Sequence, residues 1–410
     1  MKKWKQAVLV AAIALILGLS VKAETQAAIT GVKQTDAGTS SVSVSSGTDL
    51  LAKYYVLFIS TDQNIWVEKD YSSSPNNLSA SGLSAGSTYY AQVRGASDYD
   101  FVNGERVWEW ATDPSAVLEV VTVPDTSTAK VVQTGATLNS ITMQLSGVSG
   151  ANYYFLGSSG IYSSAQVYAA STTPTITAGN LNPNTSYTMY AYACRKAATT
   201  GFIAHSSYDA DADYSAKTLS SKINTNNFGV TGTYSNINVY YFGIASGLQA
   251  DGYQFQFQTL KGKVKKDVVQ TSNSLRLENF INGTFYKYRV RSYVDCGTNK
   301  AYGAWSDFRF IGMSKNVSGV SKTRGSKRTI RCSWKKVTGA SGYVVYISKS
   351  QTGGFKKVKS LSSKKNSIVI TKIGKKKLKK NTRYYVRIVT KGKNGKKAVT
   401  SDVNTILSGS

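Results

Sequence analysis

Histidine and cysteine are scarce in this chain of 410 residues, and their scarcity excludes several kinds of active site. His205 is the only histidine, so a Ser-His-Asp or Cys-His arrangement could use that residue alone, and no Gly-x-Ser-x-Gly turn accompanies it. Cys194, Cys296 and Cys332 are odd in number and far apart, which argues against a disulfide framework and against a metal site. Paired carboxylates for glycoside hydrolysis are conceivable only in the acidic first quarter. We therefore expect no enzymatic activity, no metal and no cofactor.

Long apolar runs are also lacking, with one exception at the start of the chain. Three lysines within the first five residues precede an apolar run from Ala7 to Val21, and small residues then offer cleavage after Ala23 or Ala27. This pattern is typical of a secretory signal peptide, and the run is too short for a membrane span. We expect residues 1–27 to be a signal peptide and the mature chain to be secreted, with no membrane span after cleavage.

Helical periodicity is absent from the rest of the sequence, which instead alternates apolar and polar residues in short runs such as "SITMQLS" and "YQFQFQ". Such period-two patterning predicts β-strands. Cys332 alternates with Ile330 and Trp334 in the same manner, so we expect it in a hydrophobic core. The sequence thus predicts an all-β protein.

One frame recurs four times, with an apolar residue followed six positions later by a tyrosine that begins an alternating strand. The frames are "LSAGSTY" (Leu83 to Tyr89), "LNPNTSY" (Leu181 to Tyr187), "FINGTFY" (Phe280 to Tyr286) and "KKNTRY" preceded by Leu378 and ending at Tyr384. Their near-equal spacing predicts four structural units. We expect each frame to form a corner in which the apolar side chain and the tyrosine ring enter the core, while the tyrosine hydroxyl satisfies a backbone group.

These frames resemble the fibronectin type III family, whose signature Leu-x-Pro-x-Thr-x-Tyr is closely matched by "LNPNTSY". The stretch "IRCSWKKVTGASGYVVYIS", with Trp334, is similar to that family's B and C strands, and "AYGAWSDFRF" is similar to the entry to its last strand. The resemblance implies four tandem immunoglobulin-like β-sandwiches of seven antiparallel strands, each able to fold alone. The expected units are residues 28–124, 125–219, 220–313 and 314–410. The lysine-rich fourth unit resembles versions found in secreted and surface proteins of Gram-positive gut-type bacteria.

Charge is distributed unequally over these units. The first carries 5 basic and 11 acidic residues, the second 4 and 4, the third 11 and 5, and the fourth 26 and 1. A net charge of +25 on one small unit exceeds what solubility requires, although a solubilising surface is the simpler alternative. We expect a polyanionic partner, such as teichoic acid or an acidic polysaccharide of the cell wall. Nucleic acid would be bound only non-specifically, because no base-reading motif is present.

The basic residues assigned to this interaction lie around the fourth corner and on strands of the third and fourth units. Alternation after each corner tyrosine places the cations of the following strand on the outer face. Cross-strand pairing with carboxylates is the structural alternative. The candidate polyanion-binding residues are Lys375, Lys376, Lys377, Lys379, Lys380, Arg383, Arg387, Lys287, Arg289 and Arg291.

Aromatic residues offer a second kind of candidate site in the first two units. Tyr190 and Tyr192 are expected on an outer sheet face, where rings can stack on sugars, although tyrosine is also a common strand residue. Trp108 and Trp110 flank Glu109 and fall on one face. We expect one of them to pack in the core and at least one to be exposed as a candidate contact, and exposure of both would indicate a sugar or partner site. Host glycans or surface proteins would be the partners here.

Taken together, these features predict a non-catalytic secreted or cell-surface binding protein. Its basic C-terminal unit would be held on cell-wall or matrix polyanions, and its N-terminal units would be presented outward. The alternative is a structural spacer or matrix protein without a specific ligand, or a non-specific binder of extracellular nucleic acid or polysaccharide.

Overall fold

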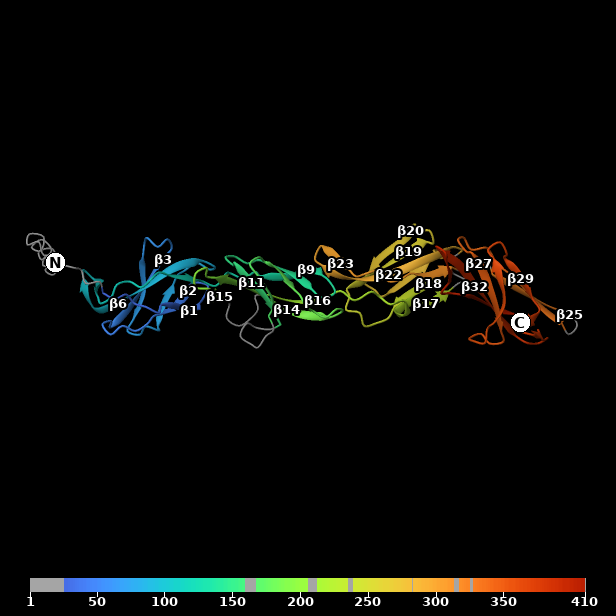
Figure 1. Cartoon of the computed structure of the whole chain (residues 1–410), viewed down its shortest axis with the longest axis horizontal. Coiled ribbons are helices and arrows are strands. Elements are labelled where there is room, and N and C mark those ends of the chain that lie inside the picture. Colours follow the sequence, from blue (N-terminus) through green and yellow to red (C-terminus); the bar gives the residue numbers. More distant parts are fainter. Residues whose placement is uncertain are drawn as a thin grey trace, which may run out of the picture. The chain divides into compact units, whose positions relative to one another are not determined.

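The structure is a computed structural model, and it describes residues 26–158, 167–205, 212–234, 239–281, 283–312, 317–324 and 327–409 (Figure 1). The predicted signal peptide lies outside these residues apart from its last two positions, and so does Met313 at the expected third boundary. Among the described residues, no helix has the length and apolar character needed to cross a membrane. Contacts divide the chain into two compact units, Met1–Val131 with Gln144–Ile176 and Met189–Asp213, and Val132–Met143 with Thr177–Thr188 and Tyr214–Ser410.

The first eight strands form two antiparallel sheets. The first, second and fifth strands make a three-stranded sheet in the order β1-β2-β5. The other sheet has the order β4-β3-β6-β7, and β8 also pairs with β6, so the last two strands share one partner. Their bounds are β1 (Lys33–Ala37), β2 (Ser41–Ser45), β3 (Tyr54–Ser60), β4 (Val67–Ser72), β5 (Leu78–Ser81), β6 (Thr88–Val102), β7 (Glu105–Trp110) and β8 (Leu118–Val121). Inward side chains of both sheets, such as Val44, Leu57 and Val93, form one core.

The same strand order recurs in the second quarter of the chain. A three-stranded sheet has the order β13-β10-β9, and a five-stranded sheet has the order β12-β11-β14-β15, with β16 pairing with β14. The bounds are β9 (Lys130–Ala136), β10 (Ile141–Ser146), β11 (Tyr153–Gly157), β12 (Val167–Ser171), β13 (Thr175–Ala178), β14 (Ser186–Lys196), β15 (Ile203–Ala204) and β16 (Ala212–Lys217). In β10 the expected alternation is visible, because Ile141, Met143 and Leu145 are buried.

The third quarter repeats the pattern as β17-β18-β21 and β20-β19-β22-β23, with β24 pairing with β22. The bounds are β17 (Phe228–Tyr234), β18 (Val239–Ile244), β19 (Gly252–Thr259), β20 (Val264–Gln270), β21 (Ser274–Glu278), β22 (Phe285–Cys296), β23 (Asn299–Tyr302) and β24 (Arg309–Gly312), preceded by a 3-10 turn at Thr225–Asn227. Aromatic rings dominate its core, where Phe242, Phe257 and Tyr288 lie in edge-to-face or stacked contact.

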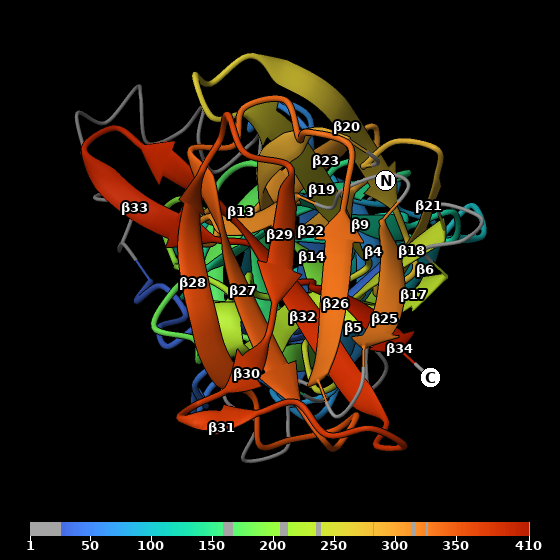
Figure 2. The ribbon, with the colours of Figure 1, turned by 90° about the vertical axis from the view of Figure 1, so that its right-hand side faces the viewer.

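The last quarter gives β25-β26-β29 and β28-β27-β32-β33, with β34 pairing with β32, and adds a small hairpin of β30 and β31. The bounds are β25 (Ser318–Arg324), β26 (Lys327–Ser333), β27 (Gly342–Ser348), β28 (Lys356–Ser362), β29 (Ser367–Ile370), β30 (Lys372–Ile373), β31 (Lys376–Lys377), β32 (Tyr384–Asn394), β33 (Lys397–Thr400) and β34 (Thr405–Gly409). Figure 2 shows β25, β26 and β29 side by side in this sandwich. Cys332 and Trp334 are buried in its core, as the alternation predicts. The predicted all-β class with repeated two-sheet sandwiches is confirmed.

The third and fourth sandwiches are joined by direct contacts. Phe285, at the start of β22, is buried in the core cluster of the fourth sandwich, together with Trp334 and Tyr343. Asp402 accepts hydrogen bonds from the Tyr288 hydroxyl (2.7 Å) and from Arg309 Nε (2.8 Å), which both belong to the third sandwich. The expectation that each unit folds alone is therefore wrong at this junction, because one core contains a side chain of the other sandwich.

A buried carboxylate makes a similar connection from the first sandwich to the β14–β15 turn. Glu119, on β8, accepts hydrogen bonds from Ala198 N (2.9 Å), Thr199 N (2.8 Å) and Thr199 Oγ1 (2.7 Å). Burial raises the pKa of the Glu119 carboxyl, but the hydrogen bonds from Ala198 and Thr199 outweigh it, so that the pKa is lowered overall. The charged form of Glu119 thus holds these two segments together.

Candidate polyanion-binding surface

The fourth corner presents its lysines on a short hairpin anchored in the core. Leu378 and the ring of Tyr384 are both buried in the core cluster of the fourth sandwich. The Tyr384 hydroxyl accepts a hydrogen bond from the backbone N–H of Lys379 at 3.0 Å. Just before it, β30 and β31 pair across a turn at Gly374, whose φ of 58° lies in the region that glycine adopts without strain. The turn and the two buried side chains fix the backbone from which the lysines project.

The other corners share this construction. The Tyr89 hydroxyl accepts from Ser84 N at 2.8 Å, and the Tyr187 hydroxyl accepts from Asn182 N at 2.8 Å. At the third corner the Tyr286 ring is buried and stacks on Phe280, with ring centroids 4.8 Å apart. The corner tyrosines are therefore structural side chains, and the lysines of the fourth corner are an addition to a shared frame.

Five lysines and one arginine of this corner are exposed to solvent. We call them the lysine corner, comprising Lys375, Lys376, Lys377, Lys379, Lys380 and Arg383. The single acidic residue in residues 314–410 is Asp402, which is occupied by Tyr288 and Arg309. The lysine corner consequently has no carboxylate of its own sandwich to neutralise it.

Arg387, the next outward cation on β32, has a different environment. Its side chain is half-buried, and its guanidinium carbon lies 3.7 Å from the centroid of the Phe355 ring. Such a cation–π contact holds the guanidinium flat against the sheet while leaving its charge in place. Arg387 therefore contributes positive potential beside the lysine corner, with less freedom to move than the lysines.

The basic stripe expected in the third sandwich is largely taken up by aromatic rings. Arg289 lies 4.2 Å from the Trp305 ring centroid, and Arg291 lies between Trp305 (4.4 Å) and Tyr302 (3.9 Å). Arg289 Nε and Nη2 also donate to Gln256 Oε1 at 3.0 and 2.8 Å. Burial lowers the pKa of both guanidinium groups.

Lys287 completes this ladder, because its ammonium group lies 4.4 Å from the Phe308 ring centroid. The outward direction predicted for these three cations is confirmed, because they are half-buried on β22 while the residues between them are buried. Their role in binding a polyanion stays a prediction, and ring faces cover part of each cation. Pairing with carboxylates was the structural alternative for these cations. Their contacts with described residues are instead with rings of the segment "AYGAWSDFRF" and with glutamine side chains. The physical reason is that ring faces and amide oxygens satisfy the cations at the sheet surface.

The tryptophans of the first sandwich are not an exposed pair. Trp108 is only 8% exposed, and its Nε1 donates to Glu68 Oε2 at 2.9 Å. Tyr54, Tyr71 and Tyr99 surround its ring. Trp108 is therefore the indole of the pair that packs, as expected for one of the two, and it is not accessible as a ligand contact. Trp110 is half-buried.

Cations also cover these rings. The Arg106 guanidinium carbon lies 3.9 Å from the Tyr71 ring centroid and 5.1 Å from that of Trp108, and Arg94 lies 4.4 Å from the Trp110 ring centroid. The outer face of the first sandwich is thus covered largely by its own side chains.

The tyrosines of the second quarter differ from each other. Tyr192 is 1% exposed and stacks on Phe155 of the neighbouring strand, with centroids 4.8 Å apart. The prediction that its ring could stack on a sugar is wrong, because the ring has no accessible face. Tyr190 is half-buried.

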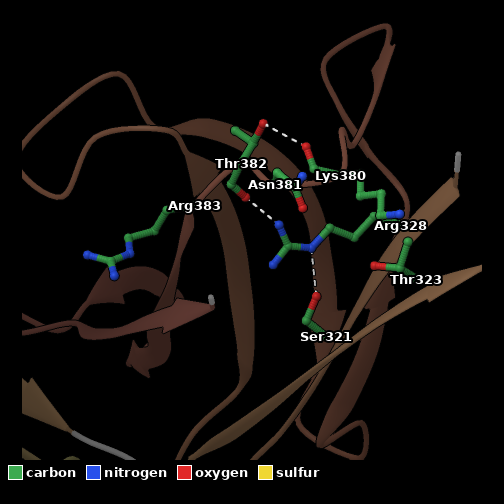
Figure 3. A pocket seen from close by; sticks show the side chains of 7 residues that line it. All are labelled: Ser321, Thr323, Arg328, Lys380, Asn381, Thr382 and Arg383. Atoms are coloured by element: carbon green, nitrogen blue, oxygen red, sulfur yellow. Dashed lines mark hydrogen bonds between the residues drawn. The ribbon is translucent and has the colours of Figure 1, made fainter.

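Arg328 is a residue of this region that the sequence reasoning did not single out. It is 6% exposed, its Nε donates to Ser321 Oγ at 2.7 Å, and its Nη1 donates to the carbonyl oxygen of Thr382. The sequence did indicate this position. On β26, Arg328, Ile330 and Cys332 alternate with the residues between them, so the Arg328 side chain is expected to point inward as the other two do. It lines a hollow beside the fourth corner (Figure 3).

Groups of three or more His, Cys, Asp or Glu side chains that could hold a metal ion do not occur in the part of the chain that the structure describes. No family model matches this chain, and no curated protein matches it.

Among solved structures, the chain is similar to the chicken CNTN1 FN1-FN3 domains, at 16% identity and a TM-score of 0.22, over 68% of this chain and 97% of that one. It is also similar to a segment of two fibronectin type III domains from chicken tenascin, at 17% identity and a TM-score of 0.21, over 44% of this chain and 97% of that one. The assignment of the fold here rests on the strand order within each sandwich.

Proposed function

We propose that this chain is an exported, non-catalytic binding protein whose fourth sandwich attaches electrostatically to an anionic polymer of a cell wall or matrix. The proposed domains are residues 28–124, 125–219, 220–313 and 314–410. In this proposal the fourth domain is the anchor, and the three others are carried by it. The polymers that fit are teichoic acids and acidic polysaccharides, while nucleic acid would be bound without sequence preference.

The observation that carries the proposal is the absence of charge compensation in the fourth sandwich. It has 26 basic residues and a single acidic one, and Asp402 is used at the junction with the third sandwich. A like-charged surface of this kind destabilises the compact state through self-repulsion. A bound polyanion would relieve the repulsion, and it would stabilise the folded state by mass action.

Salt dependence tests the electrostatic part of this proposal. If each of the six cations of the lysine corner contacts one anionic group, the logarithm of affinity should fall against the logarithm of salt concentration with a slope of about −4.2 to −5.4, taking the values known for nucleic acids. Between 50 and 200 mM salt, the affinity for purified teichoic acid should then fall roughly 300- to 2,000-fold. A flat response would contradict an electrostatic anchor.

Charge reversal tests whether the attachment is localised at the lysine corner. The variant carries glutamate at Lys375, Lys376, Lys377, Lys379 and Lys380. A matched control carries glutamate at five other exposed lysines of the same sandwich, Lys356, Lys357, Lys359, Lys364 and Lys365, and changes the net charge equally. We expect the first variant to lose sedimentation with purified cell walls and the control to keep most of it. Equal losses would indicate diffuse attraction, and retention by the first variant in molar salt would refute the anchor.

The role of a spacer is a second candidate for the first two domains. It is supported by the burial of Trp108 and Tyr192, which removes two of the four aromatic residues considered as ligand contacts. Trp110 and Tyr190 remain partly accessible. A screen of the full chain against glycans, with Trp110→Ala and Tyr190→Ala as controls, separates the candidates. Binding that depends on either ring would favour a ligand site over a spacer.

A further inference from the structure

Arg328 is a buried cation whose sandwich provides no carboxylate to balance it. Only 6% of the residue is exposed, and Asp402, the one acidic residue of residues 314–410, is bound to Tyr288 and Arg309. None of the ion pairs between described residues includes Arg328. A charge removed from water without a counter-charge is costly, so a buried arginine of this kind favours the presence of an anion beside it.

The guanidinium of Arg328 retains hydrogen-bonding capacity in this position. An arginine has five N–H donors, and the bonds between described residues use one on Nε, to Ser321 Oγ, and one on Nη1, to the Thr382 carbonyl oxygen. These two bonds fix the plane of the guanidinium, as Figure 3 shows. The guanidinium carbon also lies 5.8 Å from the centroid of the Tyr384 ring, and the hydrogen bonds between described residues leave three of the five donors over.

A hollow of about 440 Å³ opens beside this guanidinium. Since a water molecule takes about 30 Å³ in the liquid, the hollow has room for an anionic group together with part of the unit that carries it. It is lined by Ser321, Thr323, Arg328, Lys380, Asn381, Thr382 and Arg383. Figure 3 shows that the Arg383 side chain extends away from Arg328, so Arg328 and Lys380 are the cations of the hollow itself.

The rim of the hollow belongs to the same corner as the exposed lysines. Asn381 has a φ of 57°, a left-handed conformation that turns the backbone between Lys380 and Thr382. This turn is held by the buried Tyr384, whose hydroxyl bonds Lys379 N. The backbone of this rim is consequently set by the corner itself.

We propose that this hollow binds a single phosphate or sulfate ester group of the anionic polymer, with Arg328 as its floor. This inference rests on the proposed function, and it adds a specific site to an otherwise diffuse electrostatic surface. Donors approach from Arg328 on β26, from the hydroxyl groups of Ser321 and Thr323 on β25, and from the corner at Lys380. These hydrogen-bond donors line the hollow from different sides. Such an arrangement suits a tetrahedral oxoanion, whose oxygens do not lie in one plane, better than a planar carboxylate.

The experiment is a titration of the full chain into inorganic phosphate, followed by the line width in 31P NMR at constant ionic strength. We expect saturable binding at one site, and a loss of about tenfold or more in Arg328→Gln, since one charge-assisted hydrogen bond accounts for at least that factor. Arg328→Lys should lose nearly as much, because an ammonium lacks the fixed fork of donors. Arg331→Gln is the matched control, since Arg331 lies on the same strand and is exposed.

Competition distinguishes the possible anions. Sulfate and a phosphate monoester should displace inorganic phosphate at similar concentrations, whereas acetate should require at least tenfold more, on the geometric argument above. Equal competition by acetate would overturn the assignment to a tetrahedral group. Equal weakening by Arg328→Gln and Arg331→Gln would overturn the site, as would phosphate binding no stronger than that of chloride.

A rim variant covers the case in which Arg328 variants fail to fold. Thr323 is exposed, and Thr323→Val removes its hydroxyl while leaving Arg328 and the corner in place. We expect it to weaken phosphate binding severalfold with an unchanged circular dichroism spectrum. Unchanged phosphate affinity in this variant and in Arg328→Lys would refute the site. If the wild-type chain is retained on cell walls but shows no saturable phosphate binding, this inference alone is refuted. If the wild-type chain shows neither, the proposed function is refuted as well.

Discussion

Asp402→Ala should destabilise the fourth sandwich, because Asp402 joins it to the third. The Asp402 carboxylate is the shared acceptor for the Tyr288 hydroxyl and for Arg309 Nε, at 2.7 and 2.8 Å. Tyr288 is fully buried, and burial first, then the charge of Asp402, raises the pKa of its hydroxyl, which stays a protonated donor. Truncation to alanine therefore leaves a buried donor without its acceptor.

The size of the effect follows from these two interactions. An unsatisfied buried hydroxyl costs about 1–3 kcal/mol. The ion pair adds less than the ~3–5 kcal/mol of a fully buried one, since the Arg309 and Asp402 side chains are 29% and 20% exposed. We expect a total loss of about 2–4 kcal/mol in the free energy of unfolding. In a Tyr288→Phe background the loss should be smaller by about 1–2 kcal/mol, which is the coupling between the two groups.

Two buried thiols allow the measurement in the full chain. Cys296 lies in the third sandwich and Cys332 in the core of the fourth, and burial raises the pKa of both thiols, that of Cys332 to about 11. Because the thiolate is the reactive form, alkylation should require unfolding. Pulses of alkylating reagent across a urea gradient, read by mass spectrometry, give one unfolding curve per sandwich. We expect Asp402→Ala to lower the midpoint for Cys332 by roughly 1–2 M.

The result that would refute this reasoning is an unchanged midpoint for Cys332. A second contrary result is a shift of equal size in the Tyr288→Phe background, because it would show that the hydroxyl and the carboxylate are energetically independent. Asp402→Asn is the graded control. It keeps an acceptor for Tyr288 and removes only the charge, so its effect should lie between those of the wild type and the alanine variant.

Three further predictions concern the corners and the junctions. Replacing Tyr384 with Phe removes the hydroxyl that bonds Lys379 N and should cost about 1–3 kcal/mol in the unfolding of the fourth sandwich, measured by the same thiol assay. Phe285→Ala should destabilise that sandwich by about 3–5 kcal/mol, because it leaves a cavity in a core to which the third sandwich contributes the ring; an unchanged Cys332 curve would contradict the shared core. The lowered pKa of Glu119 stabilises its contact fully above the ordinary carboxyl value of 4.5, and this contribution is lost as pH falls through the lowered pKa. The protection factor of the Ala198 amide, which corrects for the intrinsic pH dependence of exchange, should fall over that range in the wild type. In Glu119→Gln it should be lower than in the wild type and independent of pH.

The strands and corners could be predicted from the sequence because their signals are local. Period-two alternation determines which side chains point inward, and the frame ending in Tyr384 or Tyr187 lies within seven residues. A corner of this kind depends on neighbours in the chain. Its geometry can therefore be anticipated without knowing how the sheets pair.

The outer faces could not be predicted in this way, because alternation gives the direction of a side chain and does not show what covers it. Tyr192 was assigned to an outer face, yet Phe155 covers it. The cations of the third sandwich lie on the outer face as predicted, but the rings that cover them, such as Trp305, come from a later segment of the chain.

The junction at Phe285 was missed because the repeat divides the chain into equal units and treats each as closed. Arg328 differs, since the alternation along β26 already predicted that its side chain points inward. A cation at a core position is a local conflict between pattern and chemistry, and such conflicts are where functional sites are expected.

The side-chain composition of the fourth sandwich has a consequence for the conditions under which an attached protein would stay in place. Residues 314–410 contain no histidine and no glutamate, and their one aspartate is held at a junction. Cys332, the one thiol there, has its pKa raised to about 11 by burial. This sandwich thus has no side chain that would ordinarily titrate between about pH 5 and pH 8. An organism that acidifies its surroundings would not release such a protein, whereas a rise in salt or in divalent cations would.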